Sequence, residues 1–252
     1  MGPPTPVRRV RAAVHVHSEW SYDAHLSLAE LAAMFRRKGY AAVFMCEHDR
    51  GFSAERFAAY QAACEEASMG GVCFVPGIEY ADPEDRVHVP VWGPVPFLGE
   101  AVPTADLLRA VAAHGGVAVL AHPVRRDAWQ VIDPAWLPLF AGIEFWTRKW
   151  DGWAPNPIAI DAAVRGELVP VGSLDLHTRR QMFPLAMELA LEAPVSVTAC
   201  VDALKHGQCR PVLAGLPALP WGRGLVGMAT RRIERLRRPV FRRARVLRDR
   251  SR

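Results

Sequence analysis

"VHVHSEWSYD", Val14 to Asp23, places two histidines one residue apart at the end of an apolar run. An aspartate follows the second histidine by six residues. Because side chains alternate along a β-strand, His15 and His17 are predicted to point to one side and could bind one ion. An isolated His-x-His pair is more often incidental, so the rest of the chain has to show whether this pair belongs to a site.

The composition of the 252 residues, half of them apolar, favours one main α/β domain with a full core. No apolar run reaches the roughly 18 residues of a membrane span, and the start lacks a signal-peptide pattern, so we expect a cytoplasmic protein. The five cysteines form no CxxC pair and are predicted to be reduced thiols.

The net charge of +5 is unevenly distributed along the chain. Between Arg223 and Arg252 there are twelve arginines and only two acidic residues, Glu234 and Asp249, so this segment carries +10 and the rest −5. A mildly acidic body is compatible with a carboxylate-rich cation site, whereas the basic segment favours anionic partners.

Short β-rich runs alternate with helical patterns up to about residue 215. The expected strands are Ala12–Val16, Ala41–Met45, Val72–Val75, Val87–Trp92, Val117–Ala121, Ile143–Trp146, Leu168–Val171 and Val195–Val201. Helix starts are expected at Ser27, Ser53, Thr104 and Asn156-Pro157, and helix ends near Gly39, Gly115 and Gly166. The alternation predicts a mostly parallel sheet, and about seven or eight such units suggest a barrel.

Most histidines follow these strands. Six of the nine lie within or just after strand-like runs: His15, His17, His48, His88, His122 and His177. Carboxyl ends of parallel strands share one face of a barrel, so these side chains can meet there with Glu79 of "GIEY" and Asp175 of "GSLDLH". Imidazole with carboxylate suits zinc, manganese or iron, and a carboxylate can bridge two ions. The set predicts a multi-metal site.

The same motifs carry a family resemblance. The series "HVHSEWSYD", "EHD", "GIE", "HVPVWG", "AHP", "GIEFW" and "GSLDLH" resembles the polymerase and histidinol phosphatase (PHP) family of metal-dependent phosphoesterases. The resemblance covers roughly Val10 to Val212 and implies an α/β fold, a distorted (βα)7 TIM-like barrel. We therefore expect a barrel domain over residues 1–215 and a basic helical C-terminal tail over residues 216–252.

The resemblance also implies a ligand set and a reaction. Carried over position by position, it places one ion among His15, His17, Glu79 and Asp175, a second among Asp23, His48 and His177, and a third among His88, His122 and the bridging Glu79. It implies two to three divalent ions (Zn, Mn or Fe) and catalytic roles for Glu79, Asp175 and His177. The implied activity is hydrolysis of a phosphomonoester or phosphodiester, of a sugar, nucleotide or oligonucleotide, by metal-activated hydroxide.

Residues beside these motifs are candidates for substrate contact. Arginine binds phosphate bidentately, and the candidates are Arg50, Arg125, Arg126, Arg148, Arg179 and, as an aromatic contact, Trp146. Each arginine alone is more often a surface charge. The tryptophan-rich segment 145–157 either stacks on a sugar or base or forms a small core of its own. Glu47 is expected to hydrogen-bond a metal ligand rather than accept a proton.

The C-terminal segment has an amphipathic pattern. Ile233, Leu236, Val240 and Leu247 recur at heptad-like intervals, which predicts a helix interrupted near Pro239. Such a helix could bind an anionic membrane surface, nucleic acid or an acidic protein, and the protein would be membrane-peripheral in the first case. A helix packed on the body with a solvated basic face is the simpler alternative.

Two other function classes compete with the phosphoesterase. Amidohydrolase-like C–N or C–O hydrolases also use His-x-His on a strand, commonly with a modified lysine, for which Lys149 is the only candidate near a motif. Because Glu79 already supplies a bridging carboxylate without any modified lysine, the amidohydrolase-like class ranks second. The third is a non-catalytic polyanion-binding module with structural metal, but a structural zinc site needs only four ligands. The sequence leaves the substrate and the oligomeric state open.

Overall fold

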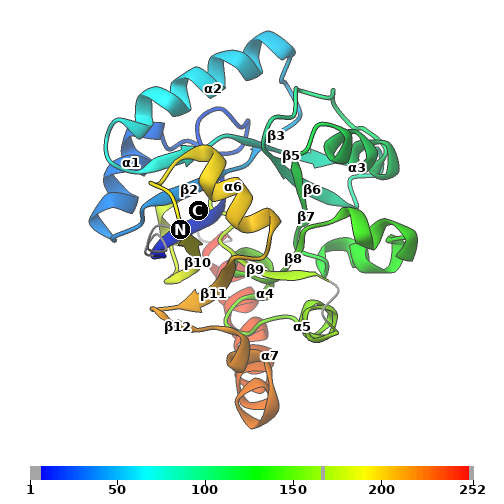
Figure 1. The fold of residues 1–252 in the computed structure, drawn as a ribbon. Helices are drawn as coiled ribbons and strands as arrows, with labels where there is room; N and C mark the ends of the chain where they lie inside the picture. The colour runs from blue at the N-terminus through cyan, green and yellow to red at the C-terminus, as the bar shows by residue number, and fades with distance from the viewer. Residues whose placement is uncertain (1–6, 166–167, 250–252) are drawn as a thin grey trace, which may run out of the picture.

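The computed structural model describes residues 7–165 and 168–249, with backbone alone for residues 163, 164 and 238–249. The described strands pair into two six-stranded sheets (Figure 1). The first has the order β12 (Leu216–Pro217), β11 (Cys209–Leu213), β10 (Leu185–Leu191), β1 (Arg8–Val16), β2 (Ala42–Met45), β4 (Cys73–Val75). The second has the order β3 (Glu47–His48), β5 (Gly77–Ala81), β6 (His88–Trp92), β7 (Val117–Leu120), β8 (Gly142–Thr147), β9 (Val169–Ser173).

Helices connect and cover these strands. They are α1 (Leu28–Arg37), α2 (Ala54–Ser68), α3 (Thr104–Ala113), α4 (Arg148–Asp151), α5 (Pro157–Val164), α6 (Val197–Lys205), α7 (Gly224–Asp249) and the 3-10 helices η1 (Arg125–Val131), η2 (Pro134–Leu139), η3 (Arg179–Gln181) and η4 (Leu219–Gly222). The predicted capping box at the start of α1 is confirmed, because Ser27 and Glu30 satisfy each other's backbone N–H groups. Ser53 caps α2 as predicted, whereas the expected helix end at Gly166 lies outside the described residues.

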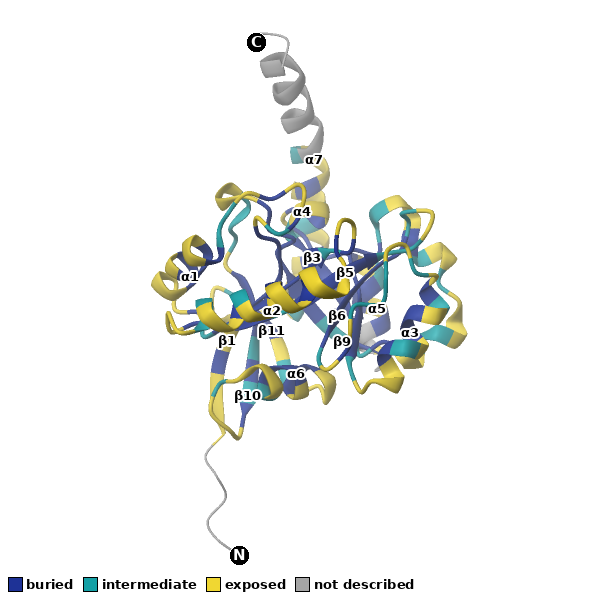
Figure 2. Cartoon of the chain, turned by 90° about the horizontal axis from the view of Figure 1, so that it is seen from above, coloured by how far each residue is buried: buried dark blue, intermediate teal, exposed yellow. Residues whose placement is uncertain are grey.

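From Ala12 to Val16, strand β1 is buried on both of its faces, whereas Arg8, Arg9 and Arg11 are exposed; Figure 2 colours the chain by burial. Val10, Ala12 and Val14 belong to one apolar cluster, which includes Cys200 and Leu204 of α6. Ala13 and Val16 belong to the larger apolar cluster, to which α1 and α2 also contribute side chains. Burial on both faces explains why the run reads as continuously apolar rather than alternating.

The two sheets meet at the end of β1. Leu174, just after β9, donates its N–H to the Val14 carbonyl at 3.0 Å, and Leu176 donates to the His15 carbonyl at 3.1 Å. On the other side, Cys46 between β2 and β3 donates to the Val16 carbonyl at 2.8 Å. These hydrogen bonds bring the segments that follow β1, β2 and β9 to one place.

The prediction of a mostly parallel sheet is wrong. β1 pairs parallel with β2, and β8 with β9, but β10 is antiparallel to β1 and β11, and β6 is antiparallel to β5 and β7. Residues 82–87 alone connect β5 to β6, which is too short for a parallel crossover. One consequence is that His88, the first residue of β6, lies opposite Ala81 at the end of β5.

The predicted strand Val195–Val201 is also wrong, because this segment forms the start of α6. Its β-branched residues favour a strand, but Ser196 accepts a hydrogen bond from the Ala199 N–H and begins a helix. Cys200, Val201 and Leu204 then share one buried face against the first sheet. Packing of this face outweighs the weak intrinsic β-propensity. The strands of this region are β10 and β11 instead.

Helix α7 continues past Pro239 as one helix, so the predicted interruption there is wrong. A proline inside a helix removes one hydrogen bond and can bend the helix without ending it. Among the described helices, none combines the length and apolar character needed to cross a bilayer. All five cysteines are free thiols, as predicted.

Replacing Gly77 by alanine is expected to destabilise the fold. A Cβ at Gly77 would collide with the Trp92 ring and the Val91 carbonyl, both on the paired strand β6. Overpacking of this kind costs about 1–3 kcal/mol. Urea denaturation should therefore show a lower midpoint with an unchanged slope. Gly70→Ala is the matched control, since Gly70 is exposed, and a midpoint for Gly77→Ala equal to that of the control would contradict the packing described here.

Candidate metal centre

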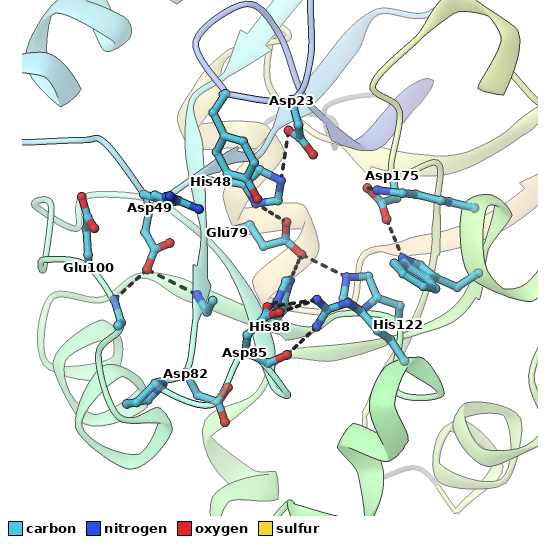
Figure 3. A pocket seen from close by; sticks show the side chains of 18 residues that line it. Asp23, His48, Asp49, Glu79, Asp82, Asp85, His88, Glu100, His122 and Asp175 are labelled. Atoms are coloured by element: carbon cyan, nitrogen blue, oxygen red, sulfur yellow. Dashed lines mark hydrogen bonds and ion pairs between the residues drawn. The ribbon is translucent and has the colours of Figure 1, made fainter.

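The carboxylate of Glu79 lies at the middle of the site. Glu79 is in β5, is almost completely buried, and lies beside His48 of β3 in the strand register. Five imidazoles surround its two oxygens, those of His15, His17, His48, His88 and His122. Figure 3 shows four of the site's members, Glu79, His48, His88 and His122, converging from different elements. A single buried carboxylate among this many rings could be shared between two cations.

The two oxygens of Glu79 face different groups. Oε1 lies 2.9 Å from His88 Nδ1 and 3.0 Å from His122 Nε2. Oε2 lies 3.1 Å from His48 Nδ1, on the opposite side of the carboxylate. The histidines thus divide into one set at the β6 and β7 side and another at the β1 and β3 side.

The β1 side is formed by His15, His17 and Asp175. The Nε2 atoms of His15 and His17 lie 3.4 and 3.6 Å from Glu79 Oε2. The same two nitrogens lie 3.8 and 3.5 Å from Asp175 Oδ1. Four donor groups from three strand ends therefore point into one small volume.

A third set lies nearer the solvent. Asp23, in the loop after β1, lies 3.3 Å from His48 Nε2 through one oxygen and 3.0 Å from His177 Nε2 through the other. The rings of His17 and His177 are 4.1 Å apart between centroids, so this set is contiguous with the β1 side. Donor atoms of His17, His48 and His177 all lie within 4.8 Å of one another.

The backbone at these strand ends is unusual. His15, His122 and Asp175 all have positive φ, at 63°, 23° and 47°. Residues other than glycine seldom adopt this region, and such positions concentrate at functional sites. The register of β1 shifts between Val14 and Val16, so His15 and His17 converge through a bulge rather than through regular alternation.

Three buried imidazole nitrogens have no hydrogen-bond partner: His15 Nε2, His17 Nε2 and His122 Nδ1. Buried polar atoms are nearly always paired, and the Nε2 atoms of His15 and His17 lie 3.4–3.8 Å from the carboxylates of Glu79 and Asp175, so both are placed to bind a cation. The donors are imidazoles and carboxylates, the ligands that zinc, manganese and iron accept. On this observation, the residues fit a metal cluster.

Glu144 of β8 fixes the orientation of His15, a role that the sequence did not reveal. Its Oε1 lies 2.7 Å from His15 Nδ1. Its Oε2 accepts hydrogen bonds from the backbone N–H of His122 at 2.9 Å and from the Thr147 hydroxyl at 2.6 Å. When His15 Nδ1 carries the proton toward this carboxylate, Nε2 keeps its lone pair for the site. The only sequence signal was a carboxylate inside the apolar run "GIEFW".

Glu47 supports the second histidine through serine. It is buried and accepts hydrogen bonds from the Ser18 N–H and from the hydroxyls of Ser18 and Ser21. Ser21 Oγ in turn lies 3.3 Å from His17 Nδ1. Burial raises the pKa of Glu47 to about 7, and the serine hydrogen bonds limit the rise. Glu47 therefore contacts the candidate metal ligand His17 through Ser21, which agrees with the expected hydrogen-bonding role.

The charge balance of the site favours cations. Burial raises the pKa of Glu79 and Asp175, but the neighbouring imidazoles, His15 first, outweigh it and hold both carboxyl groups well below their usual range. Burial lowers the pKa of His48, yet hydrogen bonds with Asp23 and Glu79 raise it to about 10. The carboxylates are thus ionised and recruit positive charge.

A cleft of about 500 Å³ opens above these residues. Arg50 and Arg125 line it as predicted, together with Lys149, Tyr22 and Trp150. Lys149 Nζ lies 3.2 Å from Asp175 Oδ1, and Trp150 Nε1 donates to Asp175 Oδ2 at 2.7 Å. The cleft therefore combines basic and aromatic side chains with carboxylates, which beyond the donor set are Asp49, Asp82, Asp85 and Glu100.

Other candidates for substrate contact lie elsewhere. Trp146 is buried in the core and donates its indole N–H to the Gly152 carbonyl, so the prediction that it contacts substrate is corrected to Trp150 at the cleft. Arg148 lies over the Phe183 ring. The remaining two arginines do not line the cleft: Arg126 pairs with Asp85, a carboxylate of the cleft lining, and Arg179 pairs with Glu30 of α1. These three arginines follow β7, β8 and β9, and the course of the loops there, which local sequence does not set, keeps their side chains out of the cleft lining.

Asp85 is a further residue that the sequence did not reveal. It lies in the β5–β6 turn with positive φ and contacts His88 Nε2 at 2.7 Å. Arg125 donates to both of its oxygens at 2.9 Å. In the sequence, Asp85 stands in "PEDRVH", where an aspartate also suits an ordinary tight turn, so nothing there points to a contact with His88.

Comparison with known proteins was made on sequence and on structure. No family model matches the chain, and no curated protein matches it. A two-domain protein from Bacteroides vulgatus, described as containing a predicted PHP-like metal-dependent phosphoesterase, superposes with a TM-score of 0.64 at 18% identity over 82% of this chain and 65% of that one. The chain has the fold of PHP-like phosphoesterases.

Two further solved structures resemble the chain in fold. A putative metal-dependent phosphoesterase from Bifidobacterium adolescentis gives a TM-score of 0.50 at 17% identity, covering 67% of this chain and 88% of that one. The lesion-specific endonuclease PfuEndoQ from Pyrococcus furiosus gives 0.57 at 13% identity, covering 79% and 56%. The chain thus spans less than two thirds of the Bacteroides protein and of the endonuclease.

Replacing Glu144 by glutamine is expected to weaken metal binding. The neutral amide no longer fixes the His15 tautomer by charge, and loss of such a supporting group typically costs about 10–100-fold in metal affinity. Competition with a chelating dye measures the affinity, and Glu65→Gln on the exposed face of α2 is the matched control. Equal affinities for the two variants would contradict the orienting role of Glu144.

Proposed function

We propose that the chain is a metal-dependent phosphoesterase that hydrolyses a phosphomonoester or phosphodiester. The observation that carries the proposal is the convergence of the eight other predicted donor residues on Glu79, directly or through one another, with three buried imidazole nitrogens unpaired. The likeness to PHP-like phosphoesterases supports the fold in which this site lies. In this proposal the two sheets, which hydrogen bonds join at the end of β1, together form the barrel predicted from the sequence.

We propose that the ligand groups hold two to three divalent ions of zinc, manganese or iron. The groups are His15, His17, Glu79 and Asp175; Asp23, His48 and His177; and His88, His122 and the shared Glu79. Bound ions of this kind supply hydroxide at neutral pH and neutralise negative charge on phosphoryl oxygens. The two oxygens of Glu79 face different histidine sets, so its carboxylate would supply negative charge to the ions that both sets would hold.

Residues at the mouth bind and orient the substrate in this proposal. Arg50, Arg125 and Lys149 provide positive charge at the cleft for phosphate oxygens. Tyr22 and Trp150 provide aromatic surface for the group that the phosphate esterifies. The cleft volume of about 500 Å³ suits a small ester or a terminal nucleotide. The endonuclease with the same fold is consistent with a nucleotide or oligonucleotide among the substrates.

The amidohydrolase-like alternative stays in second place. Lys149 does reach the site, since its Nζ lies 3.2 Å from Asp175 and 3.4 Å from His177 Nε2. However, it follows β8 at the mouth of the cleft, and Glu79 already places a carboxylate between the two histidine sets. An unmodified lysine here suits phosphate binding better than metal bridging.

The proposal is tested with protein reconstituted separately with Zn²⁺, Mn²⁺ and Fe²⁺. Release of p-nitrophenol is measured from the phosphate monoester, the phosphate diester and the acetate ester, and ammonia release is measured from simple amides. We expect turnover of a phosphate ester with at least one metal. Turnover confined to the acetate ester or the amides would instead establish the amidohydrolase-like alternative.

A further inference from the structure

Helix α7 presents apolar side chains to solvent. Leu225, Ile233 and Leu236 recur at helical spacing on one side and are 79%, 56% and 69% exposed. Val226 and Met228 beside them are more than half exposed as well. Solvent-facing apolar patches of this size on a monomeric chain indicate an interaction surface.

The opposite side of α7 is held against the body. Gly227 packs so closely on the backbone of Gly222 in η4 that a Cβ would collide with it. Glu234 is buried and accepts the Trp153 N–H at 3.1 Å. Arg231 donates to the Gly222 carbonyl at 2.8 Å. These contacts fix the rotation of α7 about its own axis, so the apolar side of the helix faces away from the core.

This arrangement is the reverse of an ordinary surface helix. A helix of a globular domain buries its apolar stripe and exposes its charges. Here the docked side carries glycine and glutamate, and the exposed side carries leucine and isoleucine. Figure 1 shows α7 extending from the edge of the body below β12. The apolar side is therefore available to an external apolar phase.

Positive charge flanks the exposed apolar stripe. Arg232 and Arg235 are exposed and lie beside it on the helix surface. The sequence from Arg223 to Arg252 carries +10, whereas the rest of the chain carries −5. Nucleic acid would explain the charge but not the exposed leucines, and an anionic bilayer surface explains both.

We propose that α7 binds the surface of an anionic lipid bilayer. Leu225, Ile233 and Leu236 enter the boundary between headgroups and acyl chains, and the arginines contact the lipid phosphates. The acidic body faces away from the bilayer, because anionic lipids repel it. The surface lies on α7 alone, so the inference stands independently of the proposed hydrolysis.

The experiment is co-sedimentation of the full chain with vesicles. Phosphatidylcholine vesicles with about 30% phosphatidylglycerol are compared with pure phosphatidylcholine. The test variant is Ile233→Asp with Leu236→Asp. The matched control is Met69→Asp with Leu216→Asp, which changes the charge equally at two exposed apolar residues of the body, 81% and 63% exposed. Circular dichroism shows that each variant is folded.

We expect wild type and control to bind the anionic vesicles, and the α7 variant to bind at least about tenfold more weakly, since two apolar side chains no longer enter the lipid. Binding to pure phosphatidylcholine should be weaker, and added salt should reduce binding to the anionic vesicles. Equal binding by the α7 variant, or no binding by wild type, would overturn the proposal. So would a stable dimer that the α7 variant dissociates without any vesicle binding, or retention on RNA alone that the variant keeps.

Discussion

Replacing Glu79 by glutamine is expected to lower phosphate-ester turnover by more than about a hundredfold, the upper loss seen when a merely supporting group is removed. Each oxygen of Glu79 faces a different histidine set, and Glu79 belongs to two of the three proposed ion positions, so the neutral amide weakens both of these positions at once. The assay is turnover of the best substrate from the ester panel, together with metal content per chain.

The control for this variant is Glu65→Gln, the same substitution at an exposed position on α2. It should retain wild-type turnover and metal content. Circular dichroism and thermal unfolding separate loss of the site from loss of the fold. Wild-type turnover by Glu79→Gln with its full metal content would show that the bridging role assigned to Glu79 is wrong.

Removing metal is expected to lower stability by a large amount. One ion held at about a thousand times its dissociation constant adds roughly 4 kcal/mol to the free energy of unfolding. For a chain of 252 residues this corresponds to a fall in Tm of about 8–16 °C on chelation. Differential scanning calorimetry before and after chelation, and after return of the metal, measures the change.

The physical reason is the burial of ionised groups. Glu79, Asp175 and Glu144 lie together in the interior, where uncompensated charge is costly. Protonated imidazoles compensate them only in part, since the pKa of His17 is held well below its usual value by burial. A Tm unaffected by chelation, in protein shown to have held metal, would mean that the cluster is stable without cations.

Many of the donor residues could be predicted from sequence because they lie at or just after the end of a strand-like run. His15, His48 and Asp175 each stand at the end of, or just after, an apolar run, and topology alone brings such positions together. His88 was expected beside the other donors because its strand was predicted to be parallel, and this reason is wrong. It begins an antiparallel strand, and a short hairpin returns it to the same place.

The supporting residues could not be predicted in the same way. Glu144 sits inside a strand, and nothing local to it identifies His15, 129 positions away, as its partner. Trp150 and Lys149 reach the cleft through a loop whose course depends on packing. Sequence also could not show that Trp150 rather than Trp146 lines the cleft, because only tertiary packing decides which of the two indoles is buried.

The α6 segment illustrates a different limit. Val195–Val201 has strand propensity, yet a serine cap and one buried face make it a helix. Intrinsic preferences differ by about 1 kcal/mol at most, and burial of three apolar side chains exceeds this. Local patterns are therefore more informative for the site, where residue types are chemically restricted, than for elements that packing decides.

The central claim is a metal cluster around Glu79, and metal content per chain tests it most directly. Protein purified without chelator is analysed by elemental mass spectrometry, with Glu79→Gln in parallel. The account predicts about two or three zinc, manganese or iron ions per chain in wild type and fewer in the variant. Less than one ion in wild type, persisting after anaerobic reconstitution with each metal, would contradict it.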